Sequence, residues 1–181
     1  MTEARYQFGR VSSIRAIAVG QPGARRFSLQ VEASNGSTAV VWIEKEQLFN
    51  LAVALKNLIA QVEEARRRGR RRSGRISDAA PGFNGSERLE FQAGRMAVGY
   101  DDGLALFMLA ASDAEEPENA LPRLSLAVDQ GALDALADEA FSVCAAGRPL
   151  CPLCGAPLNA NEKHICPKHN GHAVLGETRA T

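Results

Sequence analysis

The chain has 181 residues, of which 45% are hydrophobic and 23% are charged, and its 21 basic and 21 acidic residues give no formal net charge. This composition excludes a collagen-like or largely disordered protein, and the length fits one ordinary domain with an appendage. No apolar run approaches the roughly 20 residues of a membrane span, and the N-terminus lacks the pattern of a signal peptide. We therefore expect a cytoplasmic protein with no membrane partner.

The neutral total hides a segregation of charge along the chain. Seven arginines fall within one short stretch that contains no acid: Arg66, Arg67, Arg68, Arg70, Arg71, Arg72 and Arg75. Without them, 14 basic and 21 acidic residues remain, so the rest of the chain is acidic. The arginine run is a candidate nucleic-acid-binding segment, because several arginines together neutralise several phosphates.

Residues 1–65 predict three strands followed by a helix. Strand patterns occupy 11–19, 27–32 and 38–43, and the Asn35-Gly36 turn makes the last two a hairpin. Apolar residues then recur at steps of three and four, as on one face of an amphipathic helix: Leu48, Leu51, Ala52, Leu55, Leu58, Ile59 and Val62. The first unit is therefore β-β-β-α.

Residues 87–147 predict the same order of elements. Strand patterns fall at 91–100, 104–110 and 124–128, and Asp129 is placed to cap a helix. The apolar face of that helix comprises Leu133, Leu136, Ala137, Ala140, Phe141 and Cys144. Between the units, residues 66–86 have no hydrophobic pattern and predict a flexible Arg/Gly-rich linker.

Short matches between the units suggest an internal repeat. Ala18-Val19-Gly20 parallels Ala97-Val98-Gly99, and the helix residues Leu48, Leu51 and Ala52 parallel Leu133, Leu136 and Ala137. The alternative is that strands and amphipathic helices look alike because they share the same periodicities. We expect an α+β fold in which two β-β-β-α units share one antiparallel sheet, with a small zinc-binding module at residues 148–181.

The C-terminal segment carries the clearest chemical signal in the chain. Cys151 and Cys154 have the C-x2-C spacing that allows two thiolates to hold one tetrahedral ion from a single turn, and Cys166 lies a short hairpin away. Thiolate and imidazole ligands favour zinc. A redox C-x2-C centre is the alternative, but it needs a thioredoxin-like βαβ context that the sequence lacks.

Spacing leaves the fourth zinc ligand open. His169 repeats the x2 spacing from Cys166, His164 lies one residue from the same cysteine, and His172 or a water molecule completes the set of alternatives. Four protein ligands predict a closed, structural site. A catalytic metal instead needs an open position and a general base, for which Glu162 is the nearby candidate.

The chain resembles an uncharacterised, mainly actinobacterial family known as a domain of unknown function, DUF3090. The resemblance covers nearly the whole length and rests on residues 19–23 (VGQPG), 27–30 (FSLQ), 43–48 (IEKEQL), 91–100 (FQAGRMAVGY), 146–155 (AGRPLCPLCG) and 164–167 (HICP). The resemblance implies that His164 and Cys166 are the second ligand pair. It implies no known activity.

These patterns favour a non-enzymatic binding or adaptor protein with structural zinc and a protein partner. The three histidines all lie in the C-terminal segment, and the sequence has no G-x-S-x-G, P-loop or H-E-x-x-H motif, so no catalytic residue is assigned. The alternatives are a nucleic-acid-binding protein that uses the arginine run and a zinc-dependent hydrolase. Five further residues are interpreted either as the lining of a ligand groove or as an ordinary solvated surface: Arg10, Arg95, Glu44, Lys45 and Gln47.

Overall fold

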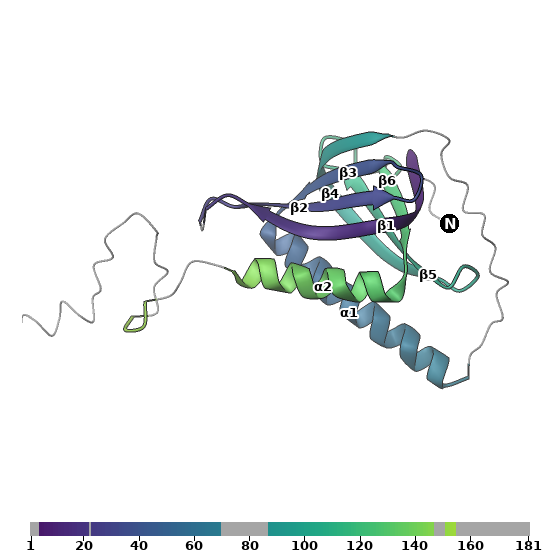
Figure 1. Ribbon diagram of the computed structural model, residues 1–181. Coiled ribbons are helices and arrows are strands. Elements are labelled where there is room, and N and C mark those ends of the chain that lie inside the picture. The colour runs from purple at the N-terminus through teal and green to yellow at the C-terminus, as the bar shows by residue number, and fades with distance from the viewer. Residues whose placement is uncertain (1–3, 22, 70–86, 147–150, 155–181) are drawn as a thin grey trace, which may run out of the picture.

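The computed structural model describes residues 4–21, 23–69, 87–146 and 151–154 of the chain (Figure 1). The elements follow the order β1 (Tyr6–Val19), β2 (Arg26–Ala33), β3 (Thr38–Ile43), α1 (Lys45–Arg67), β4 (Arg88–Asp101), β5 (Leu106–Asp113), β6 (Leu124–Val128) and α2 (Gln130–Ala145). The predicted α+β class and the β-β-β-α order of both units are confirmed. The predicted linker begins inside α1, and residues 70–86 lie outside the described chain.

The six strands form one closed barrel in which each strand lies beside its neighbour in sequence and β6 returns to β1. Four of the strand pairs are antiparallel, but β3 pairs with β4 in parallel and β6 pairs with β1 in parallel. The prediction of an antiparallel sheet is therefore wrong, and the sheet is mixed. The physical reason is that α1 crosses over between β3 and β4, so the chain enters β4 in the direction in which it left β3.

The antiparallel pairs β1–β2 and β4–β5 share one irregularity. Val11 pairs with Ala33 just before a shift in the β1–β2 register, and Ala93 pairs with Asp113 just before a shift in the β4–β5 register. Along the two strands, the pair Ala18–Phe27 lies as many residues from Val11–Ala33 as the pair Tyr100–Phe107 lies from Ala93–Asp113. The two pairs therefore correspond. The predicted match of Ala18 with Ala97 is therefore wrong, because three similar letters cannot fix a register that the bulge determines.

The helix correspondence agrees with the structure. Glu44 is the N-cap of α1 and Asp129 is the N-cap of α2, and the buried Leu48, Leu51 and Ala52 follow the first cap at the intervals at which Leu133, Leu136 and Ala137 follow the second. The predicted cap is confirmed, because the Asp129 Oδ1 accepts a hydrogen bond of 2.9 Å from the backbone N–H of Ala132.

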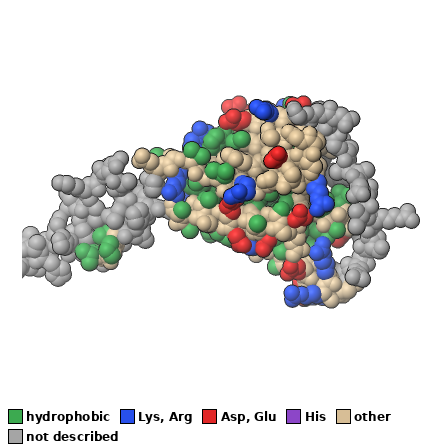
Figure 2. Space-filling model, viewed as in Figure 1, with side chains coloured by type: hydrophobic (Ala, Val, Ile, Leu, Met, Phe, Trp, Pro, Cys, Tyr) green, Lys and Arg blue, Asp and Glu red, His purple; other side chains and the backbone are tan. Residues whose placement is uncertain are grey.

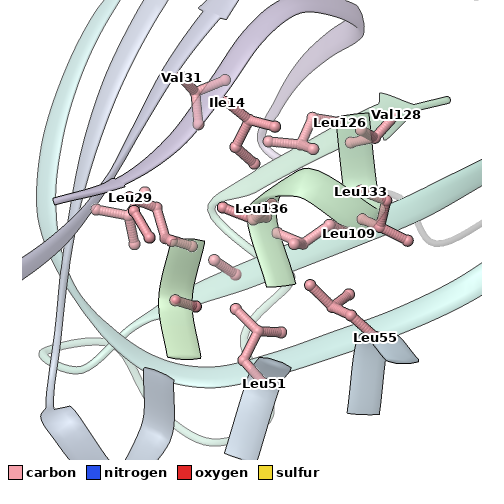
Figure 3. Packing of buried hydrophobic residues seen from close by; sticks show 14 of the residues in the cluster. Ile14, Leu29, Val31, Leu51, Leu55, Leu109, Leu126, Val128, Leu133 and Leu136 are labelled. Carbon is pink, nitrogen blue, oxygen red and sulfur yellow. The ribbon is translucent and has the colours of Figure 1, made fainter. Parts of the chain in front are cut away.

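The core forms where the apolar faces of both helices meet the strands. Figure 1 shows α1 and α2 side by side against one side of the barrel. In Figure 3, Leu51 and Leu55 of α1 and Leu133 and Leu136 of α2 point toward strand side chains such as Leu109, and all of them belong to one buried cluster. Neither described helix is long and apolar enough to cross a membrane.

A carboxylate of α2 ties that helix to β1. The Glu139 side chain accepts hydrogen bonds from the Arg15 guanidinium, at 2.8 Å from Nε and 2.5 Å from Nη2, and one of 2.8 Å from the backbone N–H of Ala16. The hydrogen bond from Arg15 is the main reason why the pKa of Glu139 lies below its ordinary value of 4.5.

We predict that Glu139→Gln destabilises the fold at neutral pH and that this loss disappears in acid. A carboxyl group whose pKa is lower in the folded state stabilises above the unfolded pKa and loses that contribution as the pH falls through the folded pKa. The expected loss is about 0.2–1 kcal/mol at pH 7, because the pair is partly solvated. Urea unfolding of both proteins at pH 7 and at steps below pH 4.5 measures the difference.

Asp102→Asn is the matched control, because Asp102 is exposed and forms no ion pair with a described residue. It should leave the free energy of unfolding nearly unchanged at either pH. A gap between wild type and Glu139→Gln that stays constant across this pH range contradicts the assignment.

Candidate functional site

The structure describes half of the predicted zinc ligand set. Cys151 and Cys154 lie in one turn, residues 151–154, where Cys151 is buried and Cys154 is half-buried. A turn that carries two thiols at this spacing fits the way in which C-x2-C pairs hold zinc. The remaining predicted ligands, His164 or its alternative His169 together with Cys166, lie outside the described residues.

Within the part of the chain that the structure describes, no three His, Cys, Asp or Glu side chains are grouped so as to hold a metal ion. The zinc site therefore stays a prediction whose described half is the Cys151–Cys154 turn.

The arginine run begins at the end of α1. Arg66 and Arg67 are in its last turn and Arg68 is its C-cap, while the other four predicted residues, Arg70, Arg71, Arg72 and Arg75, lie outside the described chain. Arg66 donates hydrogen bonds to Gln130 and to the Tyr100 hydroxyl, at 3.1 Å and 2.5 Å. Arg68 pairs with Glu64 at 2.8 Å. Two of the three described arginines are thus engaged within the fold.

A pocket of about 360 Å³ opens at the opposite end of α1, where α2 ends. Its walls come from the β1–β2 turn, the beginning of β2, the junction of β3 with α1, one residue of β4 and the last residues of α2. The lining residues are Gly23, Arg25, Arg26, Phe27, Trp42, Ile43, Glu44, Lys45, Gln92, Val143, Cys144 and Ala146. We call this the α2-end pocket.

Basic side chains dominate the charge of the α2-end pocket. Arg25, Arg26 and Lys45 line it together with one acid, Glu44. The Lys45 ammonium and the Arg26 guanidinium form no ion pair with a described residue. Figure 2 shows basic side chains near the end of the molecule where the β1–β2 hairpin and the end of α2 lie. The pocket is therefore positive, although acidic residues outnumber basic ones in the chain outside the arginine run.

An aromatic side chain anchors the basic wall of the pocket. The Arg26 guanidinium carbon lies 3.9 Å from the centroid of the Trp42 ring, which is the geometry of a cation–π contact. The indole N–H of Trp42 donates to Glu90 at 2.8 Å, so the ring is fixed from its far edge. Gln92 pairs with Trp42 across the parallel β3–β4 seam and brings its amide to the same pocket.

The end of α2 is tied to the pocket by two contacts. The Arg25 guanidinium donates a hydrogen bond to the carbonyl oxygen of Ala146, the C-cap residue, where a positive charge also complements the helix dipole. The Cys144 thiol contacts the carbonyl oxygen of Lys45 at 3.7 Å. Burial raises the pKa of the Cys144 thiol, against a smaller opposite effect of the Lys45 charge. Cys144 is thus a wall residue in its neutral form.

At the positions of the second unit that correspond to this pocket, there is no such surplus of positive charge. The residues that correspond to Arg26, Trp42, Lys45 and Gln92 through the repeated register and caps are Leu106, Ala127, Gln130 and Arg10. In that unit, polar groups pair with each other.

Arg10 lies 3.7 Å from Asp129, and Gln130 donates to Glu63 of α1 at 2.7 Å and accepts from Arg66. The last turns of α1 therefore supply polar partners at this place in the second unit. In the first unit, α2 ends at Ala145 and supplies no described equivalent of Glu63 or Arg66.

The five residues that the sequence offered as a ligand groove separate in the structure. Glu44 and Lys45 line the α2-end pocket. Gln47 instead binds the backbone, because its amide donates to the carbonyl of Gly94 at 3.0 Å and its oxygen accepts from the N–H of Glu44 at 3.1 Å. Arg10 pairs with Asp129 and Arg95 donates to the carbonyl of Glu118, so neither faces the pocket.

Sequence reasoning missed Arg25, Arg26 and Trp42. The available signals were two adjacent arginines directly after a turn and the only tryptophan of the chain at the end of a strand that leads into a helix.

The fold and site together define a small α+β protein in which a closed six-stranded barrel and two helices present a basic, aromatic pocket. A family model described as a protein of unknown function (DUF3090) matches residues 6–166, and the chain belongs to this family. No curated protein and no solved structure matches the chain. The family match extends through Cys166 and so includes all three predicted zinc cysteines.

We predict that Cys144 resists alkylation in the folded protein. Its thiol is buried and its raised pKa keeps the reactive thiolate scarce. Iodoacetamide at pH 7.5, followed by peptide mass spectrometry, should modify Cys144 at least about tenfold more slowly in buffer than in 8 M urea. Equal rates in the two solvents contradict its place in the wall of the pocket.

Proposed function

We propose that the protein is a non-enzymatic binding protein in which a structural zinc ion holds the C-terminal segment and the α2-end pocket receives the ligand or partner. One observation carries the proposal. The residues that end α2, Val143, Cys144 and Ala146, line the pocket, and the C-x2-C turn follows them by a few residues. The proposed metal-binding segment therefore follows one wall of the proposed binding site closely in the sequence.

The proposed role of zinc follows from this placement. A closed tetrahedral site of Cys151, Cys154, Cys166 and His164 has no open position, so its contribution is stability of the segment that contains it. Because Arg25 contacts the carbonyl oxygen of Ala146, a fixed segment after α2 also fixes one wall of the pocket. Zinc would then act on binding through geometry, without touching the ligand.

The nucleic-acid-binding alternative has weaker support from the placement of charge. A helix of 23 residues is about 34 Å long, and α1 separates Lys45 at the pocket from Arg66 and Arg67 at its other end. The two basic regions therefore lie too far apart to form one short phosphate-binding surface. Arg66 and Arg68 are also engaged within the fold. A zinc-dependent hydrolase needs an open coordination position, which the proposed four-ligand set lacks.

We predict one zinc ion per chain, lost in Cys151→Ser and retained in Cys144→Ala. The second variant is the matched control, because Cys144 lies on α2 outside the motif. Metal content by mass spectrometry gives the stoichiometry, and far-ultraviolet circular dichroism should show an intact barrel in both variants. His164→Ala and His169→Ala, compared in the same way, identify the fourth ligand.

Zinc bound by only three protein ligands with a water at the fourth position contradicts the structural role and favours the hydrolase. A chain that is purified without zinc and does not take it up contradicts the zinc site altogether.

We also predict that a partner captured from native cells depends on the pocket end of the molecule. Wild type and Arg67→Gln should capture the same partner, and Cys151→Ser and Trp42→Ala should lose it. Quantitative mass spectrometry of the captured material measures the ratio, with a loss of at least about tenfold expected if contacts near Trp42 contribute as interface hot spots do. Capture that depends on Arg67 and resists loss of Trp42 contradicts the proposal.

A further inference from the structure

The chemistry of the α2-end pocket selects a class of ligand, and this inference rests on the proposed function because it concerns the same pocket. Three positive groups and one negative group line the space, in a chain whose acidic residues outnumber its basic ones outside the arginine run. The guanidinium of Arg26 and the ammonium of Lys45 pair with no described carboxylate. An anion that enters the pocket would therefore meet donors that are not already satisfied by a carboxylate.

Part of the pocket lining is apolar. Phe27, Ile43 and Cys144 are buried residues that reach the pocket wall, and Val143 adds a half-buried aliphatic surface. A bare inorganic anion would leave this surface in contact with water, whereas an apolar group attached to the anion would cover it. The volume of about 360 Å³ lies at the small end of the range for ligand pockets, roughly 300–1,000 Å³.

The basic wall is partly held in place before any ligand arrives. Arg26 is stacked on Trp42, whose ring edge is held by Glu90, and Arg25 is bound to the end of α2. Side chains that are already ordered lose less conformational entropy when they bind a ligand. Arg25 retains further N–H groups beyond the one that contacts Ala146, since a guanidinium carries five.

The second unit provides an internal comparison. At its corresponding positions, the positive charge of Arg10 faces Asp129, and Gln130 is bonded to Glu63 and Arg66. The corresponding positions therefore carry paired polar groups in one unit, and in the other two cations, Arg26 and Lys45, that form no ion pair with a described residue.

We infer that the α2-end pocket binds a small organic anion, in which a carboxylate or phosphate group meets Arg26 and Lys45 and an apolar body lies against Phe27, Ile43 and Val143.

Trp42 allows this inference to be tested directly, because it is the only tryptophan in the chain and lines the pocket. The whole chain as purified is titrated with hexanoate, hexyl phosphate, inorganic phosphate and hexanol, while tryptophan fluorescence and isothermal calorimetry are recorded. We expect saturable binding of hexanoate or hexyl phosphate in about the millimolar range, which is modest for ligands of this size. The tighter of the two identifies the anionic group.

Charge variants complete the test. Lys45→Gln should weaken binding by about two- to fivefold, and Arg26→Gln with Lys45→Gln by about tenfold, and added salt should weaken it further because these cations are exposed. Arg67→Gln is the control, since it removes the same charge at the far end of α1 and should leave the affinity unchanged. Calorimetry guards against a direct effect of Arg26 on the fluorescence of Trp42.

The inference is overturned if hexanol binds as tightly as hexanoate, if neither six-carbon anion binds, or if the double variant and Arg67→Gln bind equally well. Zinc content and partner capture are measured on the same proteins without these probes. A failure of anion binding therefore leaves the proposed function to be judged on its own results.

Discussion

The two parallel strand pairings, β3 with β4 and β6 with β1, are the constraint on which the rest of the structure depends. Each β-β-β unit by itself forms antiparallel pairs, and the parallel seams join the units into a closed ring. A parallel pairing requires a crossover, which α1 supplies between β3 and β4. Both helices then lie on the same side of the barrel and bury their apolar faces in one core. The seams also bring Gln92 beside Trp42, at the place where the pocket opens.

The repeat of the two units makes their differences informative. The helix caps, the buried helix positions and one register shift occur in both units, so the two units share these features of the backbone. What differs is the length of the helices, with 23 residues in α1 and 16 in α2. The additional turns of α1 bring Glu63 and Arg66 to the second unit and satisfy its polar groups. The shorter α2 ends beside Arg25 and Trp42 and is followed by the C-x2-C turn.

Much of the fold follows from local patterns in the sequence. The spacing of Leu48, Leu51 and Leu55 predicted α1, Asp129 predicted the start of α2, and the β6 range 124–128 agrees with the structure, because periodicity and capping act over a few residues. The parallel seams are contacts between distant segments that no local pattern encodes. The register of the repeat depends on a bulge, which a comparison of three similar residues around Ala18 could not detect.

The candidate site likewise has one part that local sequence patterns predict and one part that depends on contacts between distant segments. The Cys151–Cys154 pair is visible in the sequence because its spacing is local, and all four zinc ligands, these two included, remain predictions. The α2-end pocket was not visible, since Arg26, Lys45 and Cys144 come from three elements that only the barrel brings together.

Closure of the barrel also restricts how this protein can recognise anything else. An open sheet offers edge strands whose free N–H and C=O groups accept a further strand from a partner, with affinity that comes from the backbone. In the ring of six described strands every strand has two neighbours, but β1 and β4 pair with one neighbour along their first half and with the other along their second half. Helix side chains bond to the half-paired parts of these two strands, since Glu139 accepts from the N–H of Ala16 and Gln47 donates to the carbonyl of Gly94. Strand addition is therefore restricted, and recognition through this part of the chain depends more on side chains at the barrel ends and on the helices.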